Sequence, residues 1–429
     1  MSSRCVPSGA LSAREEQTRA SGQGPFDSAT VSVLTPSPSV LQVRREKMAF
    51  FDTQCSCIAD GLYLGSDAVA RSRQVLAEQG ITHVLNATAY SSPEYFRPVS
   101  GAVTEASCAL SASPPQHGGT AADGGPALQY FSLWLQDTPG EDLLCVLYDA
   151  CDWLDAVRRG GGRVLVHCSQ GVSRSAALCI AYLMHTQGAT FDDAFNAVKS
   201  IRGVASPNMG FACQLLQWAK RRGCSPEMTR LYRMQPHSPA DPRYVVPRQV
   251  PVQPGSNHDG RDAVLGMAAL LDARAAFVIH HRGSPTFVWH GAACAPAFAD
   301  AAWRFAEQLA RYEGAPAPAM RVQCGREPPE LLHALGVGAS HFDACRMHLA
   351  SHELRCSAYD DDFAMFFAGK RCDLAVHSGV GAQDNHLDPL SPRFNSLALG
   401  PSQPAFLPYV ERPRSARHSM PALHWPTQR

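Results

Sequence analysis

The sequence RVLVHCSQGVSRS occupies residues 163–175, and the rest of the fold can be built outward from it. Its first five residues have the apolar pattern of a buried strand, and a glycine-containing loop and a helix are expected to follow. A loop between a strand and a helix N-terminus turns consecutive backbone N–H groups toward one point, and their dipoles favour a bound phosphate. The stretch therefore predicts an α/β fold with a phosphate site at the end of this strand.

Three side chains of this loop supply reactive groups. The field that attracts phosphate also favours a thiolate at Cys168, so we expect a lowered pKa and a nucleophilic sulfur. Arg174 can offer a bidentate fork to two phosphate oxygens, and Ser175 can donate a hydrogen bond to the departing sulfur. Gly171 lets the loop curl without a side-chain clash. The alternative, an inert buried thiol at Cys168, is disfavoured because Cys, Gly and Arg occur together at this spacing.

A general acid is also needed to protonate the departing oxygen, and Asp137 is the candidate. It is expected to end a strand over residues 130–137 and to begin the loop QDTPGED, whose proline and glycine suit a mobile lid. A solvated turn or a helix cap explains Glu141 and Asp142 better than Asp137.

The chain around these residues alternates strands and helices. Further strands are expected over residues 62–64 and 81–86, and helices over residues 67–79, 143–159, 191–200 and 209–222. A second pattern predicts a hairpin from residues 275–280 and 286–290, a helix over 298–312 and a strand over 320–323. The second pattern indicates a small α+β module.

The loop has the form H-C-x-x-G-x-x-R-S, and with an aspartate upstream it resembles the dual-specificity protein phosphatases. Longer stretches, among them GLYLGSDAVA, GITHVLNAT and FDDAFNAVKSIRGVASPNMGF, resemble the plant-type mitogen-activated protein kinase phosphatases. Those proteins carry a gelsolin-like domain after the catalytic one, and LDARAAFVIHHRGSPTFVWHG is similar to it. The resemblance covers about residues 55–340.

The resemblance implies a role for individual residues. It makes Cys168 the nucleophile, Arg174 the phosphate clamp and Asp137 the general acid. Ser175 is then the hydroxyl that assists thiolate departure. His167 is implied to tune the thiol from behind, and Asn208 to brace the loop from the following helix. The implied substrate-binding set is Ser169, Gln170, Gly171, Val172, Ser173, His167 and Asn208.

The predicted fold class is α/β, with a cysteine-dependent phosphatase fold in which helices flank a central mixed sheet. A small α+β gelsolin-like domain and disordered terminal segments complete the prediction. The expected organisation is a disordered segment 1–50, a catalytic domain 55–225 with a flexible insertion at about 99–127, a Pro-rich linker 226–264, a gelsolin-like domain 265–375 and a mostly disordered tail 376–429.

Composition excludes several classes of protein. At 429 residues the chain is long enough for two domains, and 38 basic against 38 acidic residues give no net charge to attract nucleic acid or membrane. No apolar run suits a signal peptide or a membrane span, so a cytoplasmic location is expected, with the nucleus as a second one. The 15 scattered cysteines indicate reduced thiols, and we expect no metal or other cofactor.

The expected function is hydrolysis of phosphate from phosphorylated mitogen-activated protein kinases through a phosphocysteine intermediate. A phosphoinositide phosphatase is the first alternative, but such relatives carry lysine in the loop, whose variable positions are uncharged here. A phospho-binding scaffold acting through the gelsolin-like domain is the second, and the complete set of reactive residues disfavours it. Actin or calmodulin binding is a weak hypothesis, because the basic cluster at residues 220–222 also suits a helix C-terminus.

Overall fold

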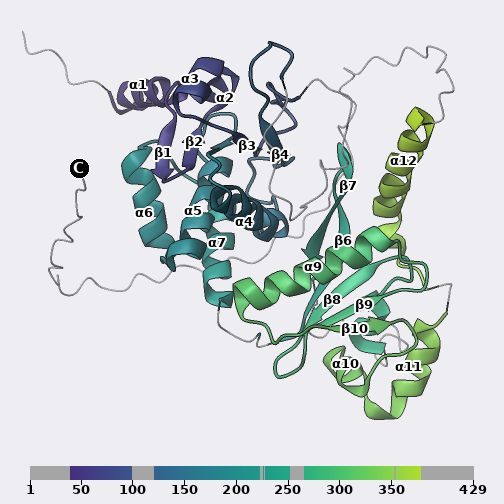
Figure 1. Ribbon diagram of the computed structural model, residues 1–429. Coiled ribbons are helices and arrows are strands. Elements are labelled where there is room, and N and C mark those ends of the chain that lie inside the picture. Colours follow the sequence, from purple (N-terminus) through teal and green to yellow (C-terminus); the bar gives the residue numbers. More distant parts are fainter. Residues whose placement is uncertain are drawn as a thin grey trace, which may run out of the picture. The chain divides into compact units, whose positions relative to one another are not determined.

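The structure is a computed structural model that describes residues 39–98, 120–222, 226, 228–251, 265–351 and 354–377 (Figure 1). Of residues 369–377 it describes only the backbone. All described residues belong to one compact unit. Within them, no helix has the length and apolar character that a membrane span requires.

The first sheet carries the loop at residues 168–173. Its strand order is β1-β2-β5-β3-β4, in which β1 is antiparallel to β2 and all other neighbours are parallel. The strands are β1 (Ser56–Ala59), β2 (Leu62–Gly65), β3 (His83–Asn86), β4 (Gln129–Ser132) and β5 (Val164–His167). This mixed sheet confirms the central sheet predicted for the phosphatase part of the fold. The central strand β5 is buried along its length. It lies between β2 and β3 and is parallel to both, so the loop after it emerges between their carboxyl ends.

Helices surround this sheet, and some of them pack on each of its two faces. They are α1 (Val40–Asp52), α2 (Asp67–Arg71), α3 (Arg73–Glu78), α4 (Leu144–Arg159), α5 (Arg174–Gln187), α6 (Phe191–Ile201) and α7 (Met209–Arg221). Helix α5 follows the loop directly, and its residues from Ser175 to Met184 are all buried. It ends at Gln187, and the next residue, Gly188, has the left-handed conformation common at helix C-termini. The loop is thus held between a buried strand and a buried helix.

A second five-stranded sheet follows, in the order β10-β9-β8-β6-β7. Its strands are β6 (Arg230–Ser238), β7 (Asp241–Gln249), β8 (Ala276–His280), β9 (Phe287–His290) and β10 (Met320–Gln323), and β8 and β9 form the predicted hairpin. The helices of this module are α9 (Pro296–Glu313), α10 (Pro329–Ala334), α11 (Phe342–Leu349) and α12 (Asp360–His377), with short 3-10 turns η2 (Gly266–Leu270), η3 (Ala339–His341) and η4 (Ser357–Tyr359). The predicted α+β module is therefore present.

The prediction of a linker over residues 226–264 is wrong for residues 230–249, which form β6 and β7. Within these two strands, the prolines occupy positions where a missing N–H is tolerated. Strand β7 is at the edge of the sheet, and β6 pairs with β8 only from Arg230 to Arg233, before Pro236. Residues 252–264 of the predicted linker lie outside the described residues.

Other predicted boundaries also shift. Helix α1 begins at Val40 within the segment expected to be disordered, and Ser39 caps it by accepting a hydrogen bond from the Gln42 amide at 3.2 Å. The helix expected over residues 67–79 divides at Ser72, which caps α3. Of the predicted insertion, residues 120–127 are described and make bridges at Thr120 and Ala121, whereas residues 1–38, 99–119 and 378–429 lie outside the described part.

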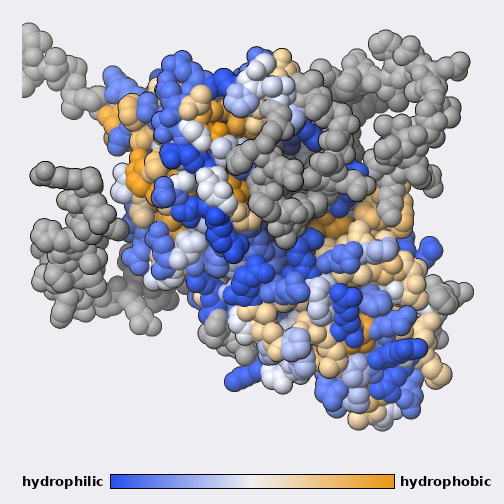
Figure 2. All heavy atoms as spheres, viewed as in Figure 1, coloured by the Kyte–Doolittle hydropathy of each residue, from blue (hydrophilic) through white to orange (hydrophobic). Residues whose placement is uncertain are grey.

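Helix α1 leaves apolar side chains on the surface. Val40, Leu41 and Phe50 are 85%, 68% and 60% exposed, and orange hydrophobic residues are visible over α1 in Figure 2. No residue of this helix is buried. Its C-terminal end is bonded to the rest of the fold, because Ser66 Oγ donates to the Asp52 carbonyl at 2.5 Å.

The two modules, one built around each sheet, meet at α4 through the buried carboxylate of Asp149. The Asp149 carboxylate accepts hydrogen bonds from the Tyr244 hydroxyl at 2.9 Å and the Gln308 amide at 2.7 Å, and lies 3.3 Å from Arg304 Nε. All three partners belong to the second module. A buried carboxylate without such partners is costly, so the modules stabilise each other.

We predict that Tyr244→Phe lowers the free energy of unfolding by about 1–3 kcal/mol, because it removes one hydrogen bond to a buried carboxylate. Urea denaturation of the full chain measures this loss. Tyr90→Phe is the matched control, because the Tyr90 hydroxyl also bonds the second module, at Ser238, but its side chain is 53% exposed. Equal losses in the two variants would contradict a special role for Asp149.

Candidate active site

The loop over residues 168–173 has a backbone conformation that only glycine at position 171 permits. Gly171 has φ +65°, and a Cβ there would lie 2.4 Å from the Gly65 carbonyl oxygen. Backbone amides outside the loop bind its carbonyls: Asp67 N donates to Ser169 O at 3.2 Å, and Ser206 N donates to Val172 O at 2.8 Å. With these carbonyls held outward, the loop can turn its own N–H groups inward.

Cys168 is buried, and its thiol accepts a hydrogen bond from the Ser175 hydroxyl at 3.1 Å. Burial alone would raise the pKa of this thiol. The Ser175 hydroxyl and amide, the charge of Arg174 and the Val172 amide outweigh burial and hold the pKa below its ordinary value. The lowered pKa expected from the sequence is therefore present, and the sulfur favours the thiolate form.

Arg174 is the first residue of α5, and its guanidinium is held beside the loop. Nη1 donates to Thr88 Oγ1 at 2.7 Å and to the Leu135 carbonyl at 3.1 Å, and Nη2 donates to Ser169 Oγ at 3.0 Å. The side chain is only 12% exposed. These bonds fix the plane of the guanidinium fork, as bidentate phosphate binding requires.

Asp137 approaches the same point from another part of the chain. The expectation that it ends a strand is wrong, because β4 ends at Ser132 and Asp137 lies in the loop before α4. Asp137 Oδ1 accepts hydrogen bonds from Ser173 Oγ at 2.7 Å and Asn208 Nδ2 at 2.9 Å, and Oδ2 lies 3.7 Å from Arg174 Nε. The structure thus brings the predicted acid to the predicted phosphate clamp.

The loop that carries Asp137 is fastened to α7. Gln214 accepts a hydrogen bond from the Leu143 amide at 2.8 Å and donates to the Glu141 carbonyl at 2.7 Å. At Gly210 a Cβ would lie 2.0 Å from the Pro139 carbonyl oxygen, so only glycine allows this approach. The segment expected to act as a lid is therefore packed against α7 in this structure.

Two predicted residues support Asp137 with their side chains. The Ser173 hydroxyl donates to Asp137 and accepts from the backbone N–H of Asn208 at 2.9 Å. The Asn208 side chain caps α7, because its Oδ1 accepts from the backbone N–H of Phe211 at 2.9 Å. This arrangement orients the carboxylate. Direct contact of the Ser173 and Asn208 side chains with substrate stays a prediction.

The other predicted binding residues differ in exposure. Ser169 and Gln170 are exposed, Val172 is partly buried, and His167 is fully buried. Burial lowers the pKa of His167 to about 4, so its imidazole is neutral at pH 7. Any tuning of the thiol by His167 would have to act without a positive charge.

Two residues at the site were missed in the sequence. Thr88 lies after β3 and accepts from Arg174, and its position just beyond a buried strand beside β5 was a usable signal. Arg202 follows α6 and donates to the Gly171 carbonyl at 2.7 Å. A lone arginine after an amphipathic helix gives no such signal, because it also suits the helix dipole.

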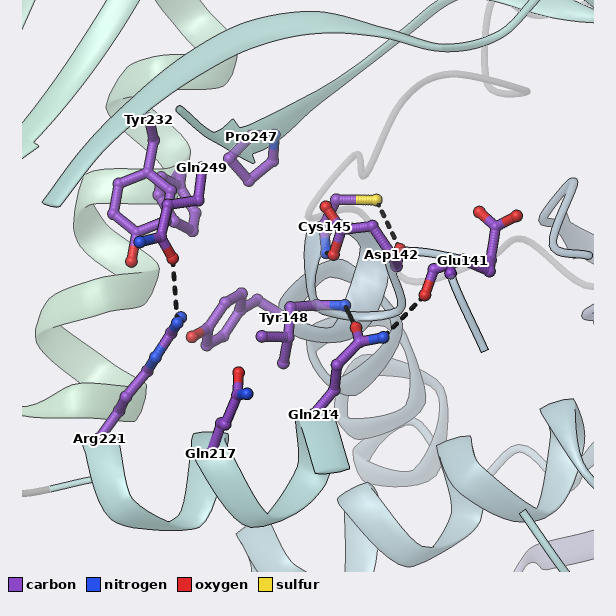
Figure 3. Close-up of a pocket in the computed structure, with 13 residues that line it drawn as sticks. Glu141, Asp142, Cys145, Tyr148, Gln214, Gln217, Arg221, Tyr232, Pro247 and Gln249 are labelled. Carbon is purple, nitrogen blue, oxygen red and sulfur yellow. Dashed lines mark hydrogen bonds between the residues drawn. The ribbon is translucent and has the colours of Figure 1, made fainter. Parts of the chain in front are cut away.

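A cavity of about 230 Å³ lies behind the acid loop, and Glu141, Tyr148, Gln214, Arg221 and Gln249 are among its lining residues (Figure 3). Neither Cys168 nor Arg174 lines it. Burial raises the pKa of Glu141, which is the behaviour of a general acid. Its position at this cavity, away from the thiol, favours Asp137 for that role.

No group of His, Cys, Asp and Glu side chains in the described ranges is arranged to hold a metal ion. The reactive groups that the structure places at the site are a thiol, a guanidinium, a carboxylate and hydroxyls. A nucleophile, an oxyanion clamp and a proton donor around one loop can transfer a phosphoryl group.

Comparison with known proteins agrees with this chemistry. The family model "Dual specificity phosphatase, catalytic domain" matches residues 62–221. Protein-tyrosine-phosphatase MKP1 of Arabidopsis thaliana is 40% identical over 344 residues, which cover 79% of this chain and 38% of the relative. Dual specificity protein phosphatase 1 of Homo sapiens is 34% identical over 157 residues, which cover 37% of this chain and 35% of the relative.

The crystal structure of human DUSP28 aligns at 32% identity over 39% of this chain and 93% of that one, with a TM-score of 0.29. The chain spans 38% or less of the length of MKP1 and of dual specificity protein phosphatase 1. The alignment with MKP1 is longer than the matched catalytic domain and so continues beyond it.

We predict that Ser175→Ala raises the pKa of Cys168, because it removes the hydroxyl that stabilises the thiolate. Iodoacetamide labelling of Cys168 at pH 7, followed by mass spectrometry, should slow by about tenfold, the effect of losing one hydrogen bond to a charged group. Thr186→Ala is the control, because its hydroxyl on the same helix donates to the Tyr182 carbonyl at 2.9 Å and not to a described residue of the loop 168–173. An unchanged labelling rate in Ser175→Ala would contradict the role of this hydroxyl.

Proposed function

The chain belongs, through residues 62–221, to the dual-specificity protein phosphatases, and we propose that it hydrolyses phosphotyrosine and phosphothreonine in mitogen-activated protein kinases. The observation that carries the proposal is the convergence of Cys168, Arg174 and Asp137. The thiol has a lowered pKa, and the carboxylate lies 3.7 Å from the guanidinium. These groups are sufficient for hydrolysis through a phosphocysteine.

In the first step the Cys168 thiolate attacks phosphorus, so an S–P bond forms and the ester P–O bond breaks. Arg174 binds two non-bridging oxygens, and the inward amides of the loop bind the charge that builds up on the phosphoryl group. Asp137, protonated at this stage, gives its proton to the departing phenolic or alcoholic oxygen. The products are the dephosphorylated side chain and the phosphocysteine.

In the second step water hydrolyses the phosphocysteine. The Asp137 carboxylate accepts a proton from the attacking water, the new P–O bond forms and the S–P bond breaks. Ser175 Oγ, 3.1 Å from the sulfur, donates to the leaving thiolate and lowers the free energy of its departure. Release of inorganic phosphate restores the thiolate, and Asp137 again holds a proton.

Two observations support a phosphoprotein substrate. The variable loop positions are Ser169, Gln170, Val172 and Ser173, none of which carries a charge for the extra phosphates of an inositol headgroup. The 40% identity to Protein-tyrosine-phosphatase MKP1 covers 79% of the chain and so includes the second module. Phosphoinositide hydrolysis is the alternative that the experiment below tests.

For the second module, we propose the gelsolin-like assignment with its start moved to β6. A five-stranded sheet and the long helix α9 support it. Calmodulin binding at residues 220–222 has less support, because two of the three cations have partners: Arg221 donates to Gln249 at 2.9 Å and Arg222 to the Met184 carbonyl at 2.6 Å.

We predict that the full chain releases both phosphates from a doubly phosphorylated kinase activation-loop peptide in the presence of a metal chelator. Cys168→Ser should abolish turnover, because an alcohol at this position is a poor nucleophile at neutral pH. Asp137→Asn should lower kcat by about 10²–10⁴ fold, the usual contribution of a positioned acid. Initial rates by phosphate release measure both effects.

Glu141→Gln is the matched control, because it changes a neighbouring carboxylate of the same loop that lines the cavity behind it. Its rate should stay near that of the wild type. A large loss in Glu141→Gln with none in Asp137→Asn would overturn the assignment of the acid. Turnover of a soluble phosphoinositide without turnover of the peptide would overturn the substrate.

A further inference from the structure

Arg202, immediately after α6, is a charged side chain with no exposure to solvent. All five of its N–H donors are used in hydrogen bonds. Its acceptors are Gly171 O at 2.7 Å from Nε, Gln54 O at 3.0 Å and Ser56 Oγ at 3.3 Å from Nη1, and Phe51 O at 3.0 Å and Gln170 O at 3.1 Å from Nη2. Arginine is rarely buried to this degree unless it has a charged partner.

The acceptors of Arg202 are four carbonyls and one hydroxyl, and none is ionised. Among the residues that the structure describes, no carboxylate accepts a hydrogen bond from Arg202. The exposed Asp52 carboxylate acts on it through its charge at longer range. A buried cation without a counterion is destabilising. The loop that Arg202 binds contains one group able to carry the opposite charge, the thiolate of Cys168. Burial lowers the pKa of Arg202. The sulfurs of Cys168, Cys55 and Cys179 and the Asp52 carboxylate oppose this effect, Cys168 most strongly.

The direction of the loop carbonyls gives Arg202 a second effect. In a planar trans peptide, the carbonyl of one residue and the N–H of the next point in opposite directions. Arg202 binds the carbonyls of Gln170 and Gly171 from outside the loop. The N–H groups of Gly171 and Val172 must therefore point the other way, and the Val172 amide is one of the groups that stabilise the Cys168 thiolate.

We propose that Arg202 is a positioning residue of the active site, which aims the Gly171 and Val172 amides at thiolate and phosphate and provides a positive charge behind the loop. The inference rests on the proposed phosphatase function, and it concerns a residue that touches neither substrate nor the reacting atoms. Two of the four carbonyls from Ser169 to Val172 are bound by this one side chain, and Asp67 N and Ser206 N bind the other two.

The same guanidinium fastens the segment between α1 and β1 to the loop. Phe51 O and Gln54 O accept from it, and its central carbon lies 5.5 Å from the centre of the Phe51 ring. A side chain that served only to pack α6 would not need to reach the loop and this segment together. Changes at Arg202 are therefore expected to act on the thiol itself as well as on stability.

Two variants separate the charge of Arg202 from its geometry. Arg202→Lys keeps the charge but loses the planar fork, and Arg202→Gln keeps a planar donor but loses the charge. For both, we expect iodoacetamide labelling of Cys168 at pH 7 to slow by about tenfold and orthovanadate to bind about tenfold more weakly, the effect of one lost charge-assisted hydrogen bond. The pH midpoint of labelling should move upward, most in Arg202→Gln.

Arg158→Lys is the matched control. Arg158 also binds a backbone carbonyl, because its Nε donates to Asp60 O at 2.9 Å, and it donates to Tyr182 Oη at 2.9 Å. Neither of these bonds involves the loop 168–173. It should lose thermal stability without a change in the labelling midpoint or in vanadate binding. If the Arg202 variants lose stability but keep the wild-type midpoint and vanadate affinity, Arg202 is only structural and the proposal is overturned.

A measurement on the unchanged side chain covers the case in which neither variant folds. In isotope-labelled wild type, the Nε–H resonance of Arg202, which bonds Gly171 O, should shift with the same pH midpoint as Cys168 labelling, and Cys168→Ser should lose this transition. A resonance that ignores the thiol titration would overturn the proposal. If wild type hydrolyses no phosphate ester, the proposed function itself fails, whereas an active enzyme with unaffected variants refutes only the role of Arg202.

Discussion

The thiolate of Cys168 is the constraint on which the surrounding structure depends, because it places a negative charge where burial opposes it. The nearest groups stabilise this charge directly: the Ser175 hydroxyl, the Val172 amide and the charge of Arg174 all favour the ionised sulfur. More distant elements act by shaping the loop. The N-terminus of α2, the segment after α6 and Arg202 hold its carbonyls away from the sulfur, so the fold around β5 serves one electrostatic task.

The proton donor meets a different requirement, because it must face the loop without being part of it. Asp137 is oriented by Ser173 and Asn208, and its loop is bonded to α7 through Gln214. The same loop leads into α4, whose outer face is covered by the second module through Asp149 and Tyr148, the latter bonded to Glu313. The second module therefore supports the helix from which the acid loop departs, although it contributes no reactive group.

Much of this could be predicted from local sequence. The strand, loop and helix around Cys168 form one continuous stretch, and the apolar periods of α4, α6 and α7 are strong. The sequence could not reveal that Asp149 is buried against Tyr244, because that pairing joins residues far apart in the chain. Nor did it reveal β6 and β7, because their prolines signal a linker unless the strands' edge position is known. Arg202 was missed for the same reason, since its role lies in contacts between distant segments.

The β6–β7 hairpin also decides where the chain can be divided. All residues of β8 are buried, and β6 covers one of its two edges. A fragment that began at residue 265 would keep β8, β9 and β10 but would leave that edge of β8 with unpaired N–H and C=O groups. Exposed apolar edges of this kind recruit strands from other molecules, so such a fragment would tend toward aggregation. A fragment keeps all five strands of this sheet only if it begins at or before residue 230, where β6 begins.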